Sequence, residues 1–316
     1  MKKSTLALTV MALLGSGAVV AAPAGGTSNS SRVDVGASNH FMFGGGNSGL
    51  KLNGSAMGYI DIAGGPVKGA NAAISARGDG TIMTPSDLGL FGSRKIAQVW
   101  NDTASVSGGS DTANIAINSV RQVDPPFFAP KFGGLVIGQV GATSPDSPAD
   151  PVVPLAVGSG VYFGEWAPAV ASPVDDSTDL NMSSANRTVW YVGDNAVAST
   201  PNMVSAQYNV VGIRQTGEGT NLPTAHELYT GTLTANYGSG TNTLTGSIDR
   251  GLETVNFAGT EIYGNGTFDN ASGANTIEGR FYNGAHELAG IYTGGASTAD
   301  HVAFGGSHNG SGTITP

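Results

Sequence analysis

An imidazole stands among apolar rings near the start of the chain. His40 is followed directly by Phe41, Met42 and Phe43, and then by three glycines. An imidazole nitrogen with a free lone pair can bind a transition metal, and flat apolar side chains can enclose a planar ligand. Histidine beside aromatic residues is also common at ordinary half-buried positions, and the segment alone favours that interpretation.

Sequence motifs that would indicate catalysis are weak or absent. Residues 44–49 fit Gly-x-Gly-x-x-Gly, but the Leu-Lys-Leu-Asn-Gly that follows is typical of a strand and turn. The helix N-terminus that would hold a pyrophosphate is therefore not expected. Asp175 and Asp176 are adjacent in a Pro/Ser/Asp-rich stretch, which suits a solvated loop better than a glycosidase pair. No Gly-x-Ser-x-Gly elbow occurs. We expect that the protein is not an enzyme.

The composition indicates an all-β protein. The 316 residues include 49 Gly and 15 Pro, and only 12% are charged, which gives many turns and few helical patterns. A hydrophobic content of 40% is enough to form cores. The formal charge of −9 argues against a nucleic-acid partner. Cysteine is absent from the sequence, which excludes disulfides and thiolate metal sites.

The first 24 residues have the pattern of a cleaved signal peptide. Lys2 and Lys3 precede an apolar run at residues 6–20, and Ala22 and Ala24 supply small residues for cleavage after Ala24. No later stretch reaches the roughly 18 apolar residues of a membrane-spanning helix. We therefore expect a secreted, extracellular protein without stable membrane insertion. Residues 25–31 are small and polar, and we expect a flexible leader there.

Residues 25–200 are predicted to form a β-rich N-terminal domain. Short apolar runs alternate with Gly, Pro, Asn and Ser clusters rather than with helical patterns. The predicted strands are Val33–Val35, Phe41–Phe43, Leu50–Leu52, Met57–Ile62, Ile96–Trp100, Ala113–Ile117, Gly134–Val140, Gly160–Phe163 and Thr188–Val192.

Regular alternation begins near residue 202 and predicts a C-terminal antiparallel barrel over residues 201–316. Gly284, Gly290 and Gly294 mark points where bends or close backbone approach are expected. The predicted strands are 203–213, 227–237, 243–248, 254–257, 264–268 and the runs that begin at 277, 288 and 302.

The sequence motifs of this barrel resemble those of a known module. Residues 279–292 read Gly-x-Phe-Tyr-x-Gly-Ala-x-Glu-Leu-x-Gly-x-Tyr, Val302-Ala-Phe-Gly-Gly306 follows, and Tyr208-Asn-Val-Val-Gly-Ile213 opens the barrel. They resemble the C-terminal eight-stranded barrel of transferrin-binding-protein-like surface proteins and of the hemophilins, which Slam-type translocons export. The lipoproteins of this group carry an acylated Cys, which is absent here, so the chain is more similar to the released hemophilins.

The resemblance implies a hemophore of a Gram-negative bacterium that serves iron acquisition. Such a protein binds haem (heme b) non-covalently, with host haemoglobin as a source. It delivers the haem to a TonB-dependent outer-membrane receptor and leaves the cell through a Slam-like translocon, the route called type XI secretion.

The resemblance implies that residues 25–200 are a β-rich, clamp-like haem-binding domain, and the residue types there suggest candidate site residues. It implies a histidine on the iron, and His40 is the only histidine before the barrel. Candidate propionate partners are Lys51, Arg121 and Lys131, and Met42, Met57 or Met83 could supply a second axial ligand, although core filling is the commoner role of methionine. The expected haem-lining residues are His40, Phe41, Met42, Phe43, Phe127, Phe128, Tyr162 and Trp190.

Two other functions stay open from the sequence. The N-terminal domain could bind a host protein such as transferrin or a complement regulator, or the chain could be an adhesive β protein. The remaining histidines, His226, His286, His301 and His308, fall in the barrel region. His226 and His286 each precede Glu-Leu, which suits the surface of a strand, and we expect none of the four to be a ligand.

Overall fold

The chain forms an all-β structure, as the sequence predicts. The computed structural model describes residues 21–65, 80–89, 91–109, 111–125, 129–141, 158–170, 177–215, 228–238, 240–270 and 276–316. Within these ranges the only helices are three short 3-10 turns, η1 (Pro85–Leu88), η2 (Asn283–Ala285) and η3 (Thr298–Asp300). None of the described helices has the length and apolar character needed to cross a bilayer. The predicted signal segment lies largely outside the described residues.

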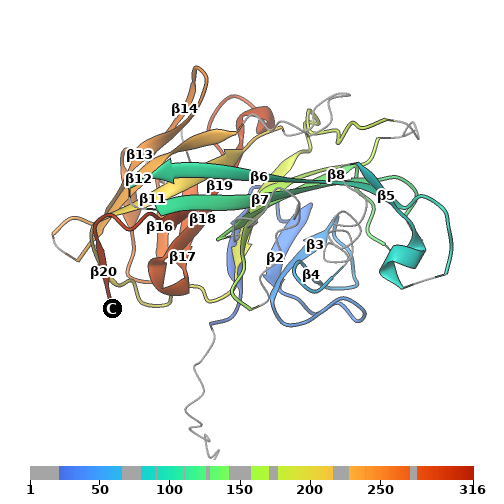
Figure 1. The fold of residues 1–316 in the computed structure, drawn as a ribbon, viewed down its shortest axis with the longest axis horizontal. Coiled ribbons are helices and arrows are strands. Elements are labelled where there is room, and N and C mark those ends of the chain that lie inside the picture. Colours follow the sequence, from blue (N-terminus) through green and yellow to red (C-terminus); the bar gives the residue numbers. More distant parts are fainter. Residues whose placement is uncertain are drawn as a thin grey trace, which may run out of the picture.

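An antiparallel sheet of seven strands forms the frame of the N-terminal half (Figure 1). Three of its strands, β8, β9 and β10, are buried along their whole length, since other layers cover both of their faces. In spatial order the strands are β1 (Ala24–Thr27), β10 (Thr188–Gly193), β9 (Val161–Ala167), β8 (Gly134–Val140), β7 (Asp111–Gln122), β6 (Ala97–Gly108) and β5 (Thr81–Met83).

The first strand replaces the flexible leader that the composition predicts. Ala24 to Thr27 pair with Gly193 to Trp190 along the edge of the sheet. The Tyr282 hydroxyl also donates to the Ala24 carbonyl at 2.8 Å. Small residues are required here because a Cβ on Gly25 would lie 2.0 Å from the Tyr191 carbonyl oxygen. The composition of this segment reflects close packing and not mobility.

A small sheet covers one face of the seven-stranded sheet. It consists of β2 (Val33–Ala37), β3 (Ser48–Leu52) and β4 (Ile60–Asp61), and its strands β2 and β3 lie against β10. Val33, Leu50 and Ile62 from this side meet Trp166 and Trp190 from the large sheet in one buried cluster. Burial of these apolar side chains holds the two layers together.

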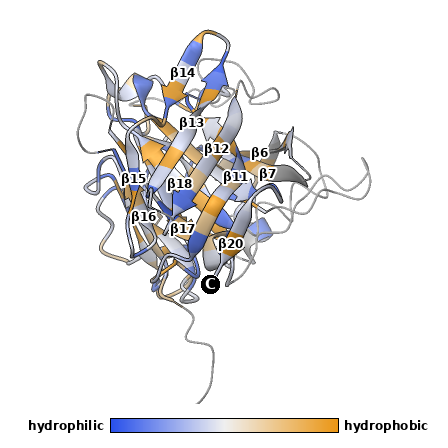
Figure 2. Ribbon diagram, turned by 90° about the vertical axis from the view of Figure 1, so that its left-hand side faces the viewer, coloured by the Kyte–Doolittle hydropathy of each residue, from blue (hydrophilic) through white to orange (hydrophobic). Residues whose placement is uncertain are grey.

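The C-terminal half is a closed eight-stranded antiparallel barrel, which confirms the sequence prediction (Figure 2). The path closes because β12 pairs with both β11 and β13. In order the barrel strands are β11 (Asn202–Ile213), β12 (Tyr229–Tyr237), β13 (Thr243–Arg250), β15 (Thr260–Ile262), β16 (Thr267–Asp269), β17 (Ile277–Tyr282), β18 (Glu287–Tyr292) and β19 (Val302–His308). The strand β14 (Glu253–Asn256) pairs antiparallel with the end of β13, and β20 (Thr313–Thr315) pairs with β11.

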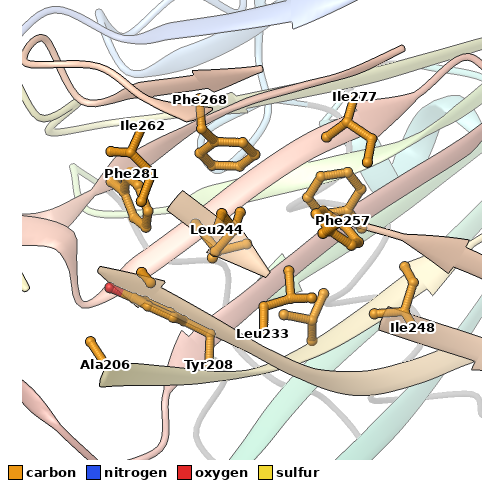
Figure 3. Packing of buried hydrophobic residues seen from close by; sticks show 14 of the residues in the cluster. Ala206, Tyr208, Leu233, Leu244, Ile248, Phe257, Ile262, Phe268, Ile277 and Phe281 are labelled. Carbon is orange, nitrogen blue, oxygen red and sulfur yellow. The ribbon is translucent and has the colours of Figure 1, made fainter. Parts of the chain in front are cut away.

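Aromatic and aliphatic side chains fill the barrel (Figure 3). Tyr208, Leu233, Phe268 and Phe281 point inward from different strands and are 0 to 1% exposed. Gly290 makes room for this core, because a Cβ there would lie 2.6 Å from the Phe304 ring and 2.4 Å from a backbone oxygen. The close backbone approach that the sequence predicts at this glycine is confirmed. A barrel filled by its own side chains has no room inside for a large ligand.

The outer wall of the barrel packs on the second face of the seven-stranded sheet. Side chains alternate along β11, so Tyr208 and Val210 point inward while Val211 and Ile213 point outward. These outward residues share one buried cluster with Phe163 of the large sheet. The two halves therefore share a hydrophobic core.

Polar contacts reinforce this junction. Arg187 on the segment before β10 pairs with Glu165 on β9 through an Nε–Oε2 contact of 2.6 Å, and both side chains are 0% exposed. The same guanidinium donates to the carbonyls of Thr298 and His301 in the barrel. At the far end of the long β6–β7 hairpin, Asn209 of β11 donates to the Gly108 carbonyl at 3.0 Å.

Candidate functional site

The segment that contains His40 is a compact loop between β2 and β3. Ser38 and Asn47 close it, since the Ser38 amide donates to the Asn47 carbonyl at 2.7 Å. The buried Asp61 carboxylate accepts hydrogen bonds from Ser38 Oγ, Asn47 Nδ2 and the Gly64 amide. A second loop is tied to the first, because the amides of Asn39 and His40 both donate to the Tyr59 carbonyl.

The side chain of His40 organises the turn that follows it. Its Nδ1 atom accepts hydrogen bonds from the amides of Met42 and Phe43, each at 3.2 Å. The ring stacks against Phe41 and Phe43, with centroid separations of 4.8 and 5.3 Å. Residues 41–43 therefore form a turn and not the predicted strand. A side-chain acceptor at this spacing offers the backbone an alternative to pairing with a neighbouring strand.

This arrangement determines which nitrogen of His40 carries the proton. Backbone amides can only donate, so Nδ1 is the acceptor and Nε2 carries the hydrogen in the neutral ring. Burial lowers the pKa of His40, which favours that neutral form. In this conformation neither nitrogen offers a free lone pair. A metal could bind only after the turn opens, because a shift of the proton from Nε2 to Nδ1 would also break the two amide hydrogen bonds.

Apolar side chains project from the tips of the two loops. Phe41 is 72% exposed, Met42 44% and Met57 39%, while His40 behind them is only 5% exposed. We call Phe41, Met42 and Met57 the loop-tip patch. Large apolar residues grouped on two loops that are tied together are typical of a binding surface.

A charged group lies beside the base of these loops. Lys51 Nζ is 3.1 Å from Asp34 Oδ2, and the Tyr59 hydroxyl donates to the same oxygen at 2.6 Å. Burial alone would raise the pKa of Asp34, but the hydrogen bonds from Tyr59 and Lys51 outweigh it and lower that pKa. Lys51, a candidate propionate partner, is thus already paired with a carboxylate.

The other candidate residues lie apart from the loop-tip patch. Tyr162 and Trp190 are 0% exposed in the core between the two sheets, and Met83 is buried in the same cluster. Burial raises the pKa of Tyr162 far above its ordinary value. Arg121 is buried on β7 and Lys131 is exposed. Phe127 and Phe128 lie outside the described residues.

Two carboxylates that sequence reasoning missed support the loop. Asp61 holds the loop from inside, and Asp194 accepts hydrogen bonds from the Ser48 amide at 2.7 Å and the Gly160 amide at 3.0 Å. Burial raises the pKa of Asp194. No motif marks either residue, because their partners are distant in sequence. No group of three or more His, Asp, Glu or Cys side chains in the described ranges is placed to hold a metal ion.

Comparison with known proteins gives a distant likeness. No family model matches the chain. The crystal structure of HpuA from Kingella denitrificans in complex with human haemoglobin aligns with a TM-score of 0.35 and 14% identity, over 66% of this chain and 87% of that one. The apo structure of the same haemoglobin receptor aligns with a TM-score of 0.35 and 13% identity, over 66% and 86%. These values are too low to transfer a ligand or partner.

Proposed function

We propose that this chain is an exported hemophore. It binds haem non-covalently through the loops around His40 and delivers it to a TonB-dependent outer-membrane receptor. The observation that carries the proposal is the loop-tip patch, where Phe41 and Met42 lie largely exposed in front of an imidazole. The predicted signal peptide and the resemblance of the barrel sequence to the hemophilins support the same function.

The residue types around His40 suit a haem. The imidazole can bind the iron, which accepts axial nitrogen ligands, and Phe41, Met42 and Phe43 supply apolar surface for the porphyrin. The conformation described here is a closed one, because Nδ1 accepts two backbone hydrogen bonds. Haem binding therefore requires that the turn opens. Glycines at 44–46 directly after it permit a wide range of backbone angles.

The energetics of opening are modest. Each of the two amide hydrogen bonds to His40 contributes about 1 kcal/mol, and the stacked rings add a similar amount. Burial of an exposed phenylalanine side chain against a ligand contributes about 1.5–3 kcal/mol. Contact of the porphyrin with Phe41 and Met42 would thus offset most of the cost. Iron coordination would then supply the net affinity.

The barrel has a separate role in this proposal. Its interior is filled, so it does not hold the ligand. Its proposed role is to carry the sequence that a Slam-like translocon recognises. Haemoglobin of the host is the proposed haem source. No catalytic step is proposed.

The loop-tip patch also favours a second candidate function, recognition of a host protein such as transferrin or a complement regulator. Exposed Phe and Met side chains are typical anchors in protein interfaces. The closed state of His40 requires no change for this role.

A hemin titration of the purified protein tests the proposal. We expect a Soret band shift that saturates at one haem per chain. His40→Ala should change the band position, since the iron loses a ligand, whereas Phe41→Ala should weaken binding about tenfold with the band unchanged. Phe91→Ala is the matched control, because Phe91 is a fully exposed phenylalanine outside the loop-tip patch.

The titration separates the candidates. A spectrum that His40→Ala leaves unchanged would remove His40 from the iron. A protein that gives no Soret shift but binds a host protein through Phe41 and Met42 would establish the second function instead.

A further inference from the structure

The barrel brings two histidines together at one end. His286 directly precedes β18, and His308 is the last residue of β19. The two strands pair with Glu287 opposite Ser307, and the His308 amide donates to the His286 carbonyl at 2.8 Å. The histidines are therefore opposite each other across the ladder, a position in which side chains touch.

The geometry of the two rings suits a shared ligand. Their centroids are 6.0 Å apart and their planes are inclined by 74°. A metal ion about 2.0–2.1 Å from one nitrogen of each ring would place the ring centres roughly 5–6 Å apart. The observed separation lies at the upper end of that range, and His286 is exposed.

The surroundings of His308 fix its tautomer. Its Nε2 lies 3.0 Å from the carbonyl oxygen of Ser311, and a carbonyl only accepts, so Nε2 carries the hydrogen. Nδ1 is then left with its lone pair. The Tyr208 ring packs against the imidazole at a centroid distance of 5.8 Å, with the two planes inclined by 67°. A histidine that donates its second nitrogen to a backbone carbonyl is the usual arrangement in metal sites.

Both histidines lie at a mouth of the barrel. They continue the inward-facing positions of Leu288 and Phe304, beyond the filled core. The ring nitrogens of His286 have no hydrogen-bond partner in the part of the chain that the structure describes. One imidazole is thus held rigidly with a lone pair available, and a second is exposed beside it.

We propose that His286 and His308 bind one divalent transition-metal ion of intermediate softness, such as Cu²⁺, Ni²⁺ or Zn²⁺. Imidazole ligands suit these ions, and their affinities follow Ni²⁺ < Cu²⁺ > Zn²⁺. Water fills the remaining coordination positions. This site is independent of the haem site proposed above, and it differs from the expectation from the sequence alone that these histidines are not ligands.

The proposal is tested on the untagged full-length protein, because a polyhistidine tag would compete for the ion. Zn²⁺ is titrated while the imidazole resonances are followed by NMR, and its affinity is measured by calorimetry. We expect one ion per chain and shifts of the His286 and His308 rings together. His286→Ala, His286→Gln and His308→Ala should each weaken binding at least tenfold.

His40→Ala is the matched control and should leave Zn²⁺ affinity unchanged. His286 is exposed, so its variants should keep the fold, which circular dichroism checks. Unchanged affinity in a protein that lacks both histidines would overturn the proposal. An equal loss in His40→Ala would also overturn it, since the ion would then be held by scattered imidazoles. A normal hemin titration of the His286 and His308 variants keeps this test separate from that of the haem site.

Discussion

Glu287 places a carboxylate in the junction between the barrel and the seven-stranded sheet. A Cβ on Gly141, at the end of β8, would lie 2.5 Å from its Oε1 atom. Asn283 Nδ2 donates to the other oxygen at 2.6 Å. Burial outweighs this hydrogen bond and raises the pKa of Glu287 to about 7. The group therefore titrates at neutral pH.

Stability should fall as the pH rises through that value. The folded state keeps the proton up to about pH 7, whereas the unfolded chain loses it near the ordinary value of 4.5. The contribution of Glu287 is thus fully present below pH 4.5 and is lost as the pH passes 7. We expect a loss of about 2 kcal/mol between pH 5 and pH 8 from this group. Urea unfolding of the wild type and of Glu287→Gln measures it, and the variant should have the smaller pH dependence.

Glu253 is the control for this prediction. A hydrogen bond from Tyr229, then one from Arg250, lowers its pKa against the effect of burial. Its contribution is present above the ordinary value and is lost as the pH falls, so Glu253→Gln should reduce stability at neutral pH. The raised pKa of Glu287 would be contradicted if Glu287→Gln and Glu253→Gln changed the pH dependence of stability in the same direction.

The sequence predicts the residue types of the candidate site but not the contacts that these residues make. The residue types at 40–43 identify a group that could bind haem or a partner. The hydrogen bonds of His40 Nδ1 to the amides of Met42 and Phe43 could not be predicted, since the run of apolar residues also fits a strand. His286 and His308 lie opposite each other because of the register of β18 and β19. The two residues are 22 positions apart, and the sequence between them does not indicate this register.

The segments β9, β10 and η3 meet at one buried ion pair. Arg187 and Glu165 are both inaccessible, and the Gln215 amide also donates to Glu165. Two barrel carbonyls, those of Thr298 and His301, accept the remaining guanidinium hydrogens. The guanidinium thus binds one carboxylate and two carbonyls, while Nδ1 of His301 beside it is buried without a hydrogen-bond partner in the described part of the chain. Removal of one partner leaves a buried charge without compensation.

Arg187→Ala should lower the free energy of unfolding by about 3–5 kcal/mol, because Glu165 stays buried without its partner. Asp124→Ala is the control, since the Arg94–Asp124 pair has both side chains more than half exposed and should cost less than about 1 kcal/mol. Chemical denaturation of both variants measures the difference. Equal effects would mean that the junction does not depend on this pair.

Strand prediction succeeded where the local pattern and the packing agree. The observed β8 has the predicted limits Gly134–Val140, and β11 starts one residue before its predicted start. The first strand was missed because two of its four residues are glycines, which usually indicate a turn. Pairing with β10 and close contact with the Tyr191 backbone select glycine there instead.

The two halves of the molecule meet through one hydrophobic cluster. Phe163 and Val140 of the sheet touch the position of Gly305 on β19, where a Cβ would lie 2.5 Å from the Phe163 ring. Ile213 and Ile291 of the barrel are buried in the same cluster. Separation of the halves would expose these side chains to water. We therefore expect the chain to unfold as a unit.

Urea unfolding should show a single transition. The three tryptophans, Trp100, Trp166 and Trp190, all lie in the seven-stranded sheet, so their fluorescence reports on that half. Far-UV circular dichroism reports on both halves. The two signals should change at the same urea concentration. Distinct midpoints would show that the barrel is stable without the sheet. Gly305→Val, which inserts atoms into the shared cluster, should move both midpoints down together.

The long β6–β7 hairpin has a further consequence for how the protein meets other molecules. Its twelve residue pairs keep one register without a bulge, from Ala97 opposite Gln122 to Gly108 opposite Asp111. One end belongs to the large sheet, and the other is held to β11 through Asn209. A regular ribbon fixed at both ends resists bending. A molecule that binds across the barrel and the large sheet therefore meets the two in one fixed orientation.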